Sequence, residues 1–272
     1  MTNGLPVALT IAGSDCSAGA GIQADLKTFQ HFQVHGLTAV TCVVSETANI
    51  VRAVHAVPVE IMRDQIELLM ESFPVAAVKT GMLYSAAHVR AVAEILRNWP
   101  QVLLVVDPVM IASTGDGLLD DEAVKIYQDL LLPVARVITP NLPEAERLLG
   151  RRITTETLEA AALELSQNYG TAVLLKGGHL EGADCVDVLA DAGTIQRFSA
   201  ARIAVASSHG TGCTLSAAVA ACLAQGEGLA RAVERSKDYL GQTLQGSYSF
   251  TGANGQVVHA LNQGTTQPKN GA

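Results

Sequence analysis

The chain has 272 residues, of which 49% are hydrophobic and 16% are charged, and its formal net charge is −8 at pH 7. This length and hydrophobic content predict a compact globular protein with little disorder. The acidic balance, with an isoelectric point near 5.3, argues against a nucleic-acid or anionic-membrane surface. Five cysteines without a CxxC spacing indicate neither a disulfide framework nor a zinc site. Because no basic leader or membrane-length apolar run is present, we expect a cytoplasmic protein.

Apolar runs of strand length alternate with segments of helical periodicity in the first part of the chain. The helix over 59–70 illustrates the pattern, since Val59, Met62 and Ile66 recur at spacings of three and four residues. We expect strands at residues 7–12, 37–44, 76–79 and 102–106, and helices at residues 21–33, 59–70 and 86–96.

The same alternation continues through the second part of the chain. Strands are expected at 137–139 and 172–176, helices near 142–149 and 155–168, and a β-hairpin from Cys185 to Phe198. Continuously apolar strands joined by helices indicate a mostly parallel sheet that is covered on both faces. No linker divides the chain, and residues 251–272, rich in Gly, Asn, Gln and Thr, are expected to form a loose C-terminal tail.

The segment 208–216 places two glycines before an alanine-rich helix over 217–223. Gly210 and Gly212 free the backbone just where the opening turn of the helix directs unpaired N–H groups and its positive dipole end outward. This arrangement predicts an anion site, with phosphate as the expected ligand and Cys213 at its mouth. The alternative is a glycine-rich turn in which Cys213 is a small apolar filler.

Polar residues also follow six of the expected strands. Ligands of an open parallel sheet lie outside the carboxyl ends of its strands, so these residues are expected to converge. Taken singly, an Asp after a strand is more often a helix cap than a ligand, and a Lys is more often a solvated surface group. The six segments are 13–15, 45–47, 79–82, 107–110, 139–144 and 176–179.

One motif points to a different function. Gly19–Ala24 matches the GxGxxA dinucleotide fingerprint, and Glu46 lies roughly where its acidic ribose partner belongs. The fingerprint should form the strand-to-helix turn itself, whereas residues 13–18 intervene between the strand and Gly19. A nicotinamide-dependent oxidoreductase therefore stays an alternative, as does a non-catalytic binding protein. A Walker P-loop, GxxxxGK[ST], does not occur.

Ordered motifs along the chain carry a family resemblance. They are Leu9–Asp15, Gly19–Phe29, Lys79–Leu83, Asp107–Met110, Thr139–Ala145, Lys176–His179 and His209–Thr214. Together they closely resemble the hydroxymethylpyrimidine/phosphomethylpyrimidine kinases of thiamine biosynthesis, which belong to the ribokinase-like superfamily. The resemblance runs from about residue 7 to residue 250. It implies one kinase domain over 1–250 with a three-layer α/β/α sandwich and a mostly parallel central sheet.

The resemblance also implies the reaction. It implies phosphorylation of 4-amino-5-hydroxymethyl-2-methylpyrimidine and then of its monophosphate, with ATP and Mg²⁺ as cofactors and a homodimer as the assembly. Pyridoxal kinases share the Gly-x-Gly-Cys sequence at 210–213, so a pyridoxal kinase is the alternative activity.

The resemblance assigns catalysis to the glycine-rich segment. Gly210, Thr211, Gly212 and Cys213 resemble an anion hole whose amides hold the charge on the transferring phosphoryl group. Most ribokinase relatives place Asp at the position of Cys213, as the base for the substrate hydroxyl. A thiolate serves as base only if the helix dipole lowers the pKa of Cys213; otherwise the thiol orients the hydroxyl.

The nucleotide and metal are expected at the next strand ends. Asn141 and Glu144 match the superfamily's Asn-x-x-Glu pattern and would hold water around a magnesium ion. Lys176 would meet nucleotide phosphates as a point charge, and Thr139 lies in the same expected site. Asp107 would support the metal shell or orient the substrate. The alternative is that Asn141 and Glu144 are only a helix cap and a first-turn acid.

The substrate pocket, by resemblance, is built from Gly13, Asp25, Glu46, Met82 and Val109. Glu46 departs from the family, which commonly presents glutamine there. A glutamine amide both donates and accepts hydrogen bonds, whereas a carboxylate only accepts. Glu46 would therefore favour a pyrimidine with a protonated ring nitrogen, or hold a proton itself through burial. The alternative is an exposed turn residue.

Overall fold

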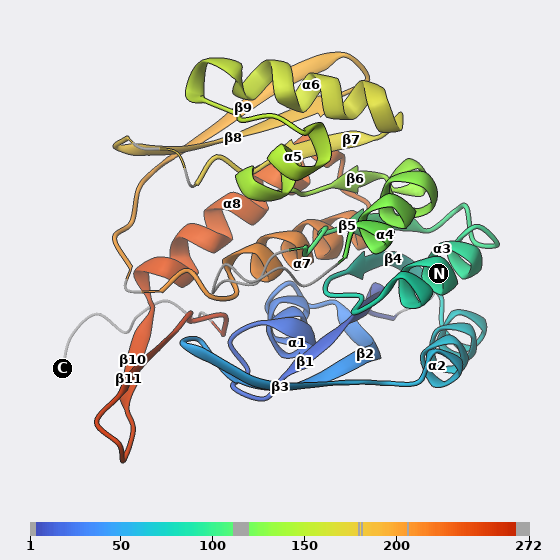
Figure 1. Cartoon of the computed structure of the whole chain (residues 1–272), viewed down its shortest axis with the longest axis horizontal. Coiled ribbons are helices and arrows are strands. Elements are labelled where there is room, and N and C mark those ends of the chain that lie inside the picture. The colour runs from blue at the N-terminus through green and yellow to red at the C-terminus, as the bar shows by residue number, and fades with distance from the viewer. Residues whose placement is uncertain (1–3, 111–119, 179, 181, 206, 265–272) are drawn as a thin grey trace.

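A nine-stranded sheet runs through the molecule, in a computed structural model that describes residues 4–110, 120–178, 180, 182–205 and 207–264. Its strand order is β3-β2-β1-β4-β5-β6-β7-β8-β9, and the six central strands are parallel (Figure 1). The edge strands β3 and β9, and β8 beside β9, run antiparallel to their neighbours. The strands are β1 (Val7–Asp15), β2 (His35–Thr47), β3 (Ile50–Ala56), β4 (Val75–Thr80), β5 (Leu103–Val106), β6 (Val137–Ile138), β7 (Ala172–Leu175), β8 (Asp184–Asp191) and β9 (Thr194–Ala201).

Helices cover both faces of this sheet. The helices are α1 (Gly21–His31), α2 (Val59–Ser72), α3 (Ala86–Leu96), α4 (Asp121–Ile126), α5 (Leu142–Leu149), α6 (Leu158–Tyr169), α7 (Thr211–Ala224) and α8 (Leu229–Gln245). One face packs against α2 to α6 and the other against α1, α7 and α8, so each face has its own apolar core. The expected α/β/α sandwich with a mostly parallel sheet is confirmed.

Short irregular helices extend two of these elements. Helix α4 continues into a π-helical turn, η1 (Tyr127–Leu131), and a 3₁₀ turn, η2 (Leu132–Val134). A further 3₁₀ turn, η3 (Thr155–Thr157), precedes α6. Among the described residues, no helix is long and apolar enough to cross a membrane.

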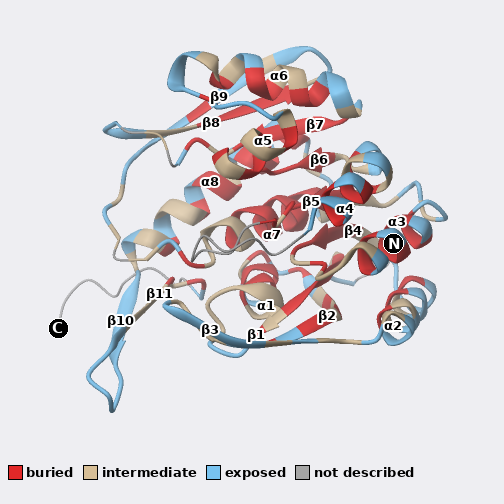
Figure 2. Cartoon of the chain, in the orientation of Figure 1, coloured by how far each residue is buried: buried red, intermediate tan, exposed pale blue. Residues whose placement is uncertain are grey.

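Helix α7 is enclosed on every side. From Thr214 to Leu223 each residue is between 0 and 4% exposed, because the helix is inserted between the sheet and the helices α1 and α8. Small side chains make this possible, since alanines let the helix approach its neighbours closely. Figure 2 shows the resulting concentration of buried residues along the central strands and α7.

The predicted loose tail is wrong for the described residues beyond Thr251. Strands β10 (Tyr248–Thr251) and β11 (Val257–Ala260) form an antiparallel hairpin that projects from the body of the molecule (Figure 1). After the hairpin the chain returns to the protein, where Leu261 and Gln263 are buried. Long-range packing and hydrogen bonds order this segment despite its polar composition, and residues 265–272 lie outside the described part.

A fully buried ion pair joins α1 to β4. The Nζ of Lys79 lies 3.0 and 2.9 Å from the two carboxylate oxygens of Asp25, and Thr10 donates to the same carboxylate at 2.6 Å. All three residues are 0% exposed. Burial opposes the charge on Lys79, but the Asp25 carboxylate outweighs it and raises the pKa of Lys79, which is therefore a cation.

Replacing Lys79 by Met would leave the Asp25 carboxylate buried without its cation. We expect Lys79→Met to lower the free energy of unfolding by about 3–5 kcal/mol, measured by urea unfolding. The double variant Lys79→Met/Asp25→Leu removes both charges and should recover most of this loss. Equal destabilisation of the single and double variants would show that packing, and not the unpaired charge, is responsible.

Candidate active site

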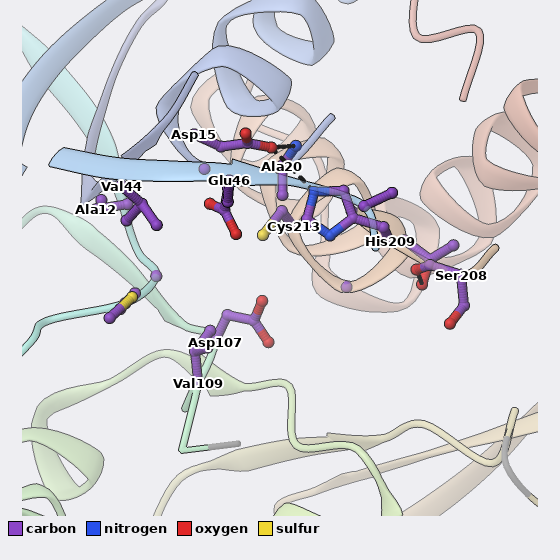
Figure 3. A pocket seen from close by; sticks show the side chains of 18 of the residues that line it. Ala12, Asp15, Ala20, Val44, Glu46, Asp107, Val109, Ser208, His209 and Cys213 are labelled. Atoms are coloured by element: carbon purple, nitrogen blue, oxygen red, sulfur yellow. Dashed lines mark hydrogen bonds and ion pairs between the residues drawn. The ribbon is translucent and has the colours of Figure 1, made fainter. Parts of the chain in front are cut away.

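The sequence-predicted residues converge on one cavity at the carboxyl ends of the parallel strands. The cavity has a volume of about 350 Å³ and reaches from the end of β2 to the first turn of α7. Figure 3 shows Glu46, Asp107 and Cys213 directed into this common space. The predicted residues that line it are Gly13, Glu46, Met82, Asp107, Val109, Asn141, Glu144, Lys176, Gly210, Thr211, Gly212 and Cys213.

Two predicted site residues lie behind the cavity wall. Asp25 was expected in the substrate pocket, but it is fully buried and its carboxylate is taken up by Lys79, which does line the cavity. Thr139 was expected at the nucleotide, but its buried hydroxyl donates to Asp107 at 3.1 Å. Both residues support groups of the cavity without facing it. His179, at the end of a quoted motif, lies outside the described residues.

The first turn of α7 supplies the anion site. Gly210 has a φ of 82°, a left-handed conformation that an L side chain rarely adopts, and it caps the helix. The amide of Thr211 donates to the carbonyl of Ser208, whereas in the described part of the chain the amides of Gly212 and Cys213 donate to no protein acceptor. These two amides and the helix dipole are therefore available to an anion.

A buried aspartate–histidine pair holds the loop beside this turn. One carboxylate oxygen of Asp15 accepts from His209 Nε2 at 3.0 Å and from the amides of Gly19 and Ala20 at 3.1 and 2.8 Å (Figure 3). Burial raises the pKa of Asp15, but the hydrogen bonds from His209 and the loop amides outweigh it and lower the pKa to about 2. Asp15 and His209 occur within the quoted motifs, yet sequence reasoning gave neither a role.

These contacts also argue against the dinucleotide alternative. A pyrophosphate-binding fingerprint needs free backbone amides at its glycine turn. Here the amides of Gly19 and Ala20 already donate to the carboxylate of Asp15, and a Cβ on Gly21 would lie 2.5 Å from the Gly13 carbonyl oxygen. The glycines of this segment thus allow close packing, Gly21 against the Gly13 carbonyl and Gly19 against the His209 ring.

A second charged pair lies against the first turn of α7. The Nζ of Lys176 is 2.9 Å from Asp107, whose other carboxylate oxygen accepts from Ser216 at 3.3 Å. Burial raises the pKa of Asp107, but Lys176 and Lys79 outweigh it, so this carboxyl group is ionised. A Cβ on Gly212 would lie 3.2 Å from the Nζ of Lys176 and 3.6 Å from Asp107, which shows how closely the pair approaches the helix.

Asn141 and Glu144 form a capping box at the start of α5. The Asn141 side chain accepts from the Glu144 amide at 2.9 Å, and the Glu144 carboxylate accepts from the Asn141 amide at 2.8 Å. Burial raises the pKa of Glu144 to about 7, against the opposing effect of Lys176. The two residues thus do cap the helix, but both also line the cavity, so the capping box does not decide whether they have a metal role as well.

The far end of the cavity is formed by the ends of β1 and β2. Glu46 is partly buried, and both burial and the nearby Asp15 carboxylate raise its pKa. The exposed Cys16 Sγ lies 3.3 Å from the Glu46 amide nitrogen, which fixes the backbone at this position. A Cβ on Gly13 would lie 2.8 Å from Cys42 Sγ, so a larger residue there would displace the Cys42 side chain. Glu46 is therefore a cavity residue and not an exposed turn residue.

Cys213 is a thiol in the free protein. Burial raises its pKa to about 11, although Lys79 and the Gly21 amide act in the opposite direction. A catalytic thiolate would require a lowered pKa, so the predicted alternative in which Cys213 is the base is not supported. The residue can orient a hydroxyl group but does not take up its proton at neutral pH without a further change in charge nearby.

Comparison with known proteins identifies the family. A family model described as phosphomethylpyrimidine kinase matches residues 15–258. The chain belongs to the phosphomethylpyrimidine kinase family. A hydroxymethylpyrimidine/phosphomethylpyrimidine kinase of Rhizobium meliloti is 44% identical over 236 residues, covering 86% of this chain and 88% of the relative. The corresponding kinase of Bacillus subtilis is 39% identical over 254 residues, covering 93% of this chain and 94% of the relative.

A longer relative matches over only part of its length. The thiamine biosynthesis bifunctional protein ThiED of Geobacter sulfurreducens is 41% identical over 254 residues, and the match covers 93% of this chain but 52% of that protein. The chain thus spans about half of the bifunctional relative.

Solved structures of two kinds of kinase share the fold. A phosphomethylpyrimidine kinase from Clostridium difficile superposes with a TM-score of 0.77 at 38% identity, covering 86% of this chain and 97% of the other. A Bacillus subtilis pyridoxal kinase, solved as an ADP complex, superposes with a TM-score of 0.86 at 33% identity, covering 96% and 98%. A pyridoxal kinase from Staphylococcus aureus was solved with AMP-PCP and pyridoxal and has a TM-score of 0.86 at 31% identity, covering 96% and 94%.

The protonated state of Cys213 can be measured by alkylation. We expect iodoacetamide to modify Cys213 slowly at neutral pH and faster as the pH rises toward its pKa of about 11, because the thiolate is the nucleophile. Peptide mass spectrometry after timed quenching would follow each cysteine, with the exposed Cys16 as internal reference. Alkylation of Cys213 at a high, pH-independent rate from neutral pH upward would contradict the raised pKa.

Proposed function

We propose that this chain transfers the terminal phosphoryl group of ATP to the hydroxymethyl group of 4-amino-5-hydroxymethyl-2-methylpyrimidine and then to the resulting monophosphate. The chain is a kinase of the phosphomethylpyrimidine kinase family, and relatives that match most of its length carry this activity in their names. The observation that carries the proposal is the position of the Asp107–Lys176 pair. It lies against the free amides of α7, across the cavity from Glu46.

Each end of the cavity suits one reactant. The Gly212 and Cys213 amides and the Lys176 cation can stabilise charge on the phosphoryl group in transfer. At the other end, Glu46 offers a carboxyl group to the polar edge of a heterocycle, beside the side chains of Met82 and Val109. The thiol of Cys213 lies between the two ends and is positioned to orient the attacking hydroxyl (Figure 3).

We also propose Mg²⁺ as the metal. Among the described residues no group of three or more His, Cys, Asp and Glu side chains could hold a metal ion. Magnesium in kinases keeps several waters and binds through one or two carboxylates together with the substrate phosphates, so this donor set fits it. Asp107 and Glu144 are the acidic residues in place, and Asn141 and Glu144 would act through water. Bound magnesium would neutralise phosphate charge.

The reaction is tested by following ADP release with ATP, Mg²⁺ and the hydroxymethylpyrimidine, with and without EDTA. We expect Cys213→Ala to lower kcat about 10²-fold, because the group that orients the hydroxyl is lost, while ATP affinity stays near normal because the backbone amides remain in place. Cys222→Ala is the matched control, since Cys222 lies in the same helix but not on the cavity. Unchanged turnover in Cys213→Ala would mean that Cys213 has a packing role and no catalytic one.

Pyridoxal phosphorylation is the second candidate. The observation that favours it is structural, since two pyridoxal kinases superpose with TM-scores of 0.86 over 96% of the chain. Pyridoxal offered as a competing substrate in the same assay distinguishes the two acceptors. A higher kcat/KM for pyridoxal than for the pyrimidine would reverse the assignment.

Glu46 should make pyrimidine binding depend on pH. Burial and Asp15 raise its pKa, so one proton is readily shared between Glu46 and the ring nitrogen. Above the pKa values of both groups, a carboxylate faces an unprotonated nitrogen with no donor between them. Affinity should therefore fall as the pH rises past the higher of these two pKa values.

Glu46→Gln should flatten this dependence, because an amide can donate to the neutral ring. Calorimetric titrations between about pH 5.5 and 8.5, a range in which small heterocycles titrate, would compare the two proteins. The control is Glu60→Gln, an exposed glutamate at the start of α2. Parallel curves for the wild type and Glu46→Gln would mean that Glu46 does not contact the ring.

The homodimer expected from the sequence stays a proposal, supported by exposed apolar side chains. Phe250 is 62% exposed on the projecting hairpin, and Ile50 on the edge strand β3 is 45% exposed. Apolar side chains at an unpaired sheet edge are typical of a protein interface. Sedimentation equilibrium of the wild type tests this, and a monomer would exclude it. The cytoplasmic location likewise stays a prediction.

A further inference from the structure

Gln263, beyond the residues that the family model matches, contacts the two segments that form the anion site. Its side chain is 2% exposed, and its Nε2 lies 3.2 Å from the carbonyl oxygen of Gly19 and 3.0 Å from the hydroxyl oxygen of Thr214. Both distances are those of hydrogen bonds, and the two hydrogens of one amide nitrogen can serve both acceptors.

The two acceptors belong to opposite sides of the anion site. Gly19 lies in the loop between β1 and α1, and its carbonyl oxygen would be 2.0 Å from a Cβ on Gly210. Thr214 lies in the first turn of α7, where its amide donates to the Gly210 carbonyl at 2.9 Å. Gln263 thus ties together the two segments whose contact shapes the turn at 210–213.

The main chain around Gln263 is firmly anchored. The hydroxyl of Tyr239 donates to the Gln263 carbonyl oxygen at 2.7 Å, and the Asn262 amide donates to the Thr243 carbonyl oxygen at 3.2 Å. Tyr239 is itself buried in the core between the sheet and α8. The side chain of Gln263 is therefore presented to the active-site segments from a fixed position.

The other half of the Gln263 amide makes no hydrogen bond to the described protein. Its Oε1 is buried, and within the described ranges it has no hydrogen-bond partner. A buried, unpaired acceptor destabilises the folded state, and an apolar side chain would avoid that penalty. The side chain contributes through its donors alone.

We propose that Gln263 is a positioning residue for phosphoryl transfer, which holds the amides of Gly212 and Cys213 at fixed positions relative to the other cavity residues. This inference rests on the proposed kinase function. Phosphoryl transfer depends on positioning more than on covalent chemistry, so a small displacement of these amides lowers the rate of the chemical step. Gln263 itself does not line the cavity and acts through Gly19 and Thr214.

The test compares two identical substitutions. We expect Gln263→Leu to lower kcat about 10- to 100-fold, with KM for ATP and for the pyrimidine near the wild-type values. Gln245→Leu, at an exposed glutamine near the end of α8, should leave kcat unchanged. Thermal unfolding of both variants, monitored by circular dichroism, should show folded proteins at the assay temperature. A wild-type kcat in Gln263→Leu would overturn the proposal.

A second variant tests the same link from its other end. Thr214→Val keeps Gln263 and its anchor but removes the acceptor hydroxyl, so it should also lower kcat, and it carries the test if Gln263→Leu does not fold. The double variant should be little worse than the poorer single variant, since residues acting through one contact are not additive. Fully additive losses in kcat would contradict a shared pathway.

The pH profile separates positioning from simple packing. Gln263→Glu keeps the shape of the side chain, but as a carboxylate it cannot donate to the Gly19 carbonyl, whereas its neutral form can. The ratio of its kcat to that of the wild type should rise as the pH falls; a flat ratio would count against the proposal. If the wild type itself releases no ADP, the kinase proposal fails; if the wild type is active and Gln263→Leu matches it, only this inference fails.

Discussion

The close approach of two backbone segments, Gly19 against Gly210, is the constraint on which the active site depends. A side chain on Gly210 would collide with the Gly19 carbonyl oxygen, and its φ of 82° suits glycine alone. This contact brings the loop after β1 to the start of α7. The Asp15–His209 pair and the Gln263 amide then fasten the same two segments from either side. The anion site is thus a property of the contact between two segments, and not of the glycine-rich turn alone.

Although the protein is acidic overall, it holds positive charge locally beside the cavity. The net charge is −8, so a phosphate-handling site cannot rely on a basic surface. Instead, carboxylates fix two lysines beside the cavity: Asp107 holds the partly buried Lys176, and Asp25 holds the fully buried Lys79. Pairing raises the pKa of each lysine and keeps its charge inside the protein. In both pairs the lysine lines the cavity.

Sequence reasoning located most of the sheet, the helices that cross it and the cavity, because apolar periodicity and strand ends are local signals. It missed β3, whose residues are mostly exposed and show no alternation. Helix α8 was not predicted either, although Leu229, Ala232 and Val233 recur at helical spacing. The burial of Asp25 could not be predicted, because the local sequence does not reveal that its partner, Lys79, lies 54 positions away.

The tail shows the same limit most clearly. Its polar composition is typical of a loose segment, but Gln263 bonds to Gly19, which lies 244 positions earlier in the chain. Local sequence patterns cannot predict a contact between residues so far apart in the chain. Likewise, the raised pKa of Cys213 follows from burial, which the glycine-rich motif does not encode.

The enclosure of α7 has a thermodynamic consequence for ligand binding. Because its residues from Thr214 to Leu223 are at most 4% exposed, the conformational entropy of this helix is lost when the chain folds. An anion that binds at its first turn meets donors that are already ordered, so little further entropy is lost there. The entropic penalty of binding at this turn then falls mainly on the ligand, which loses its own freedom of motion when it is held by donors that are already fixed.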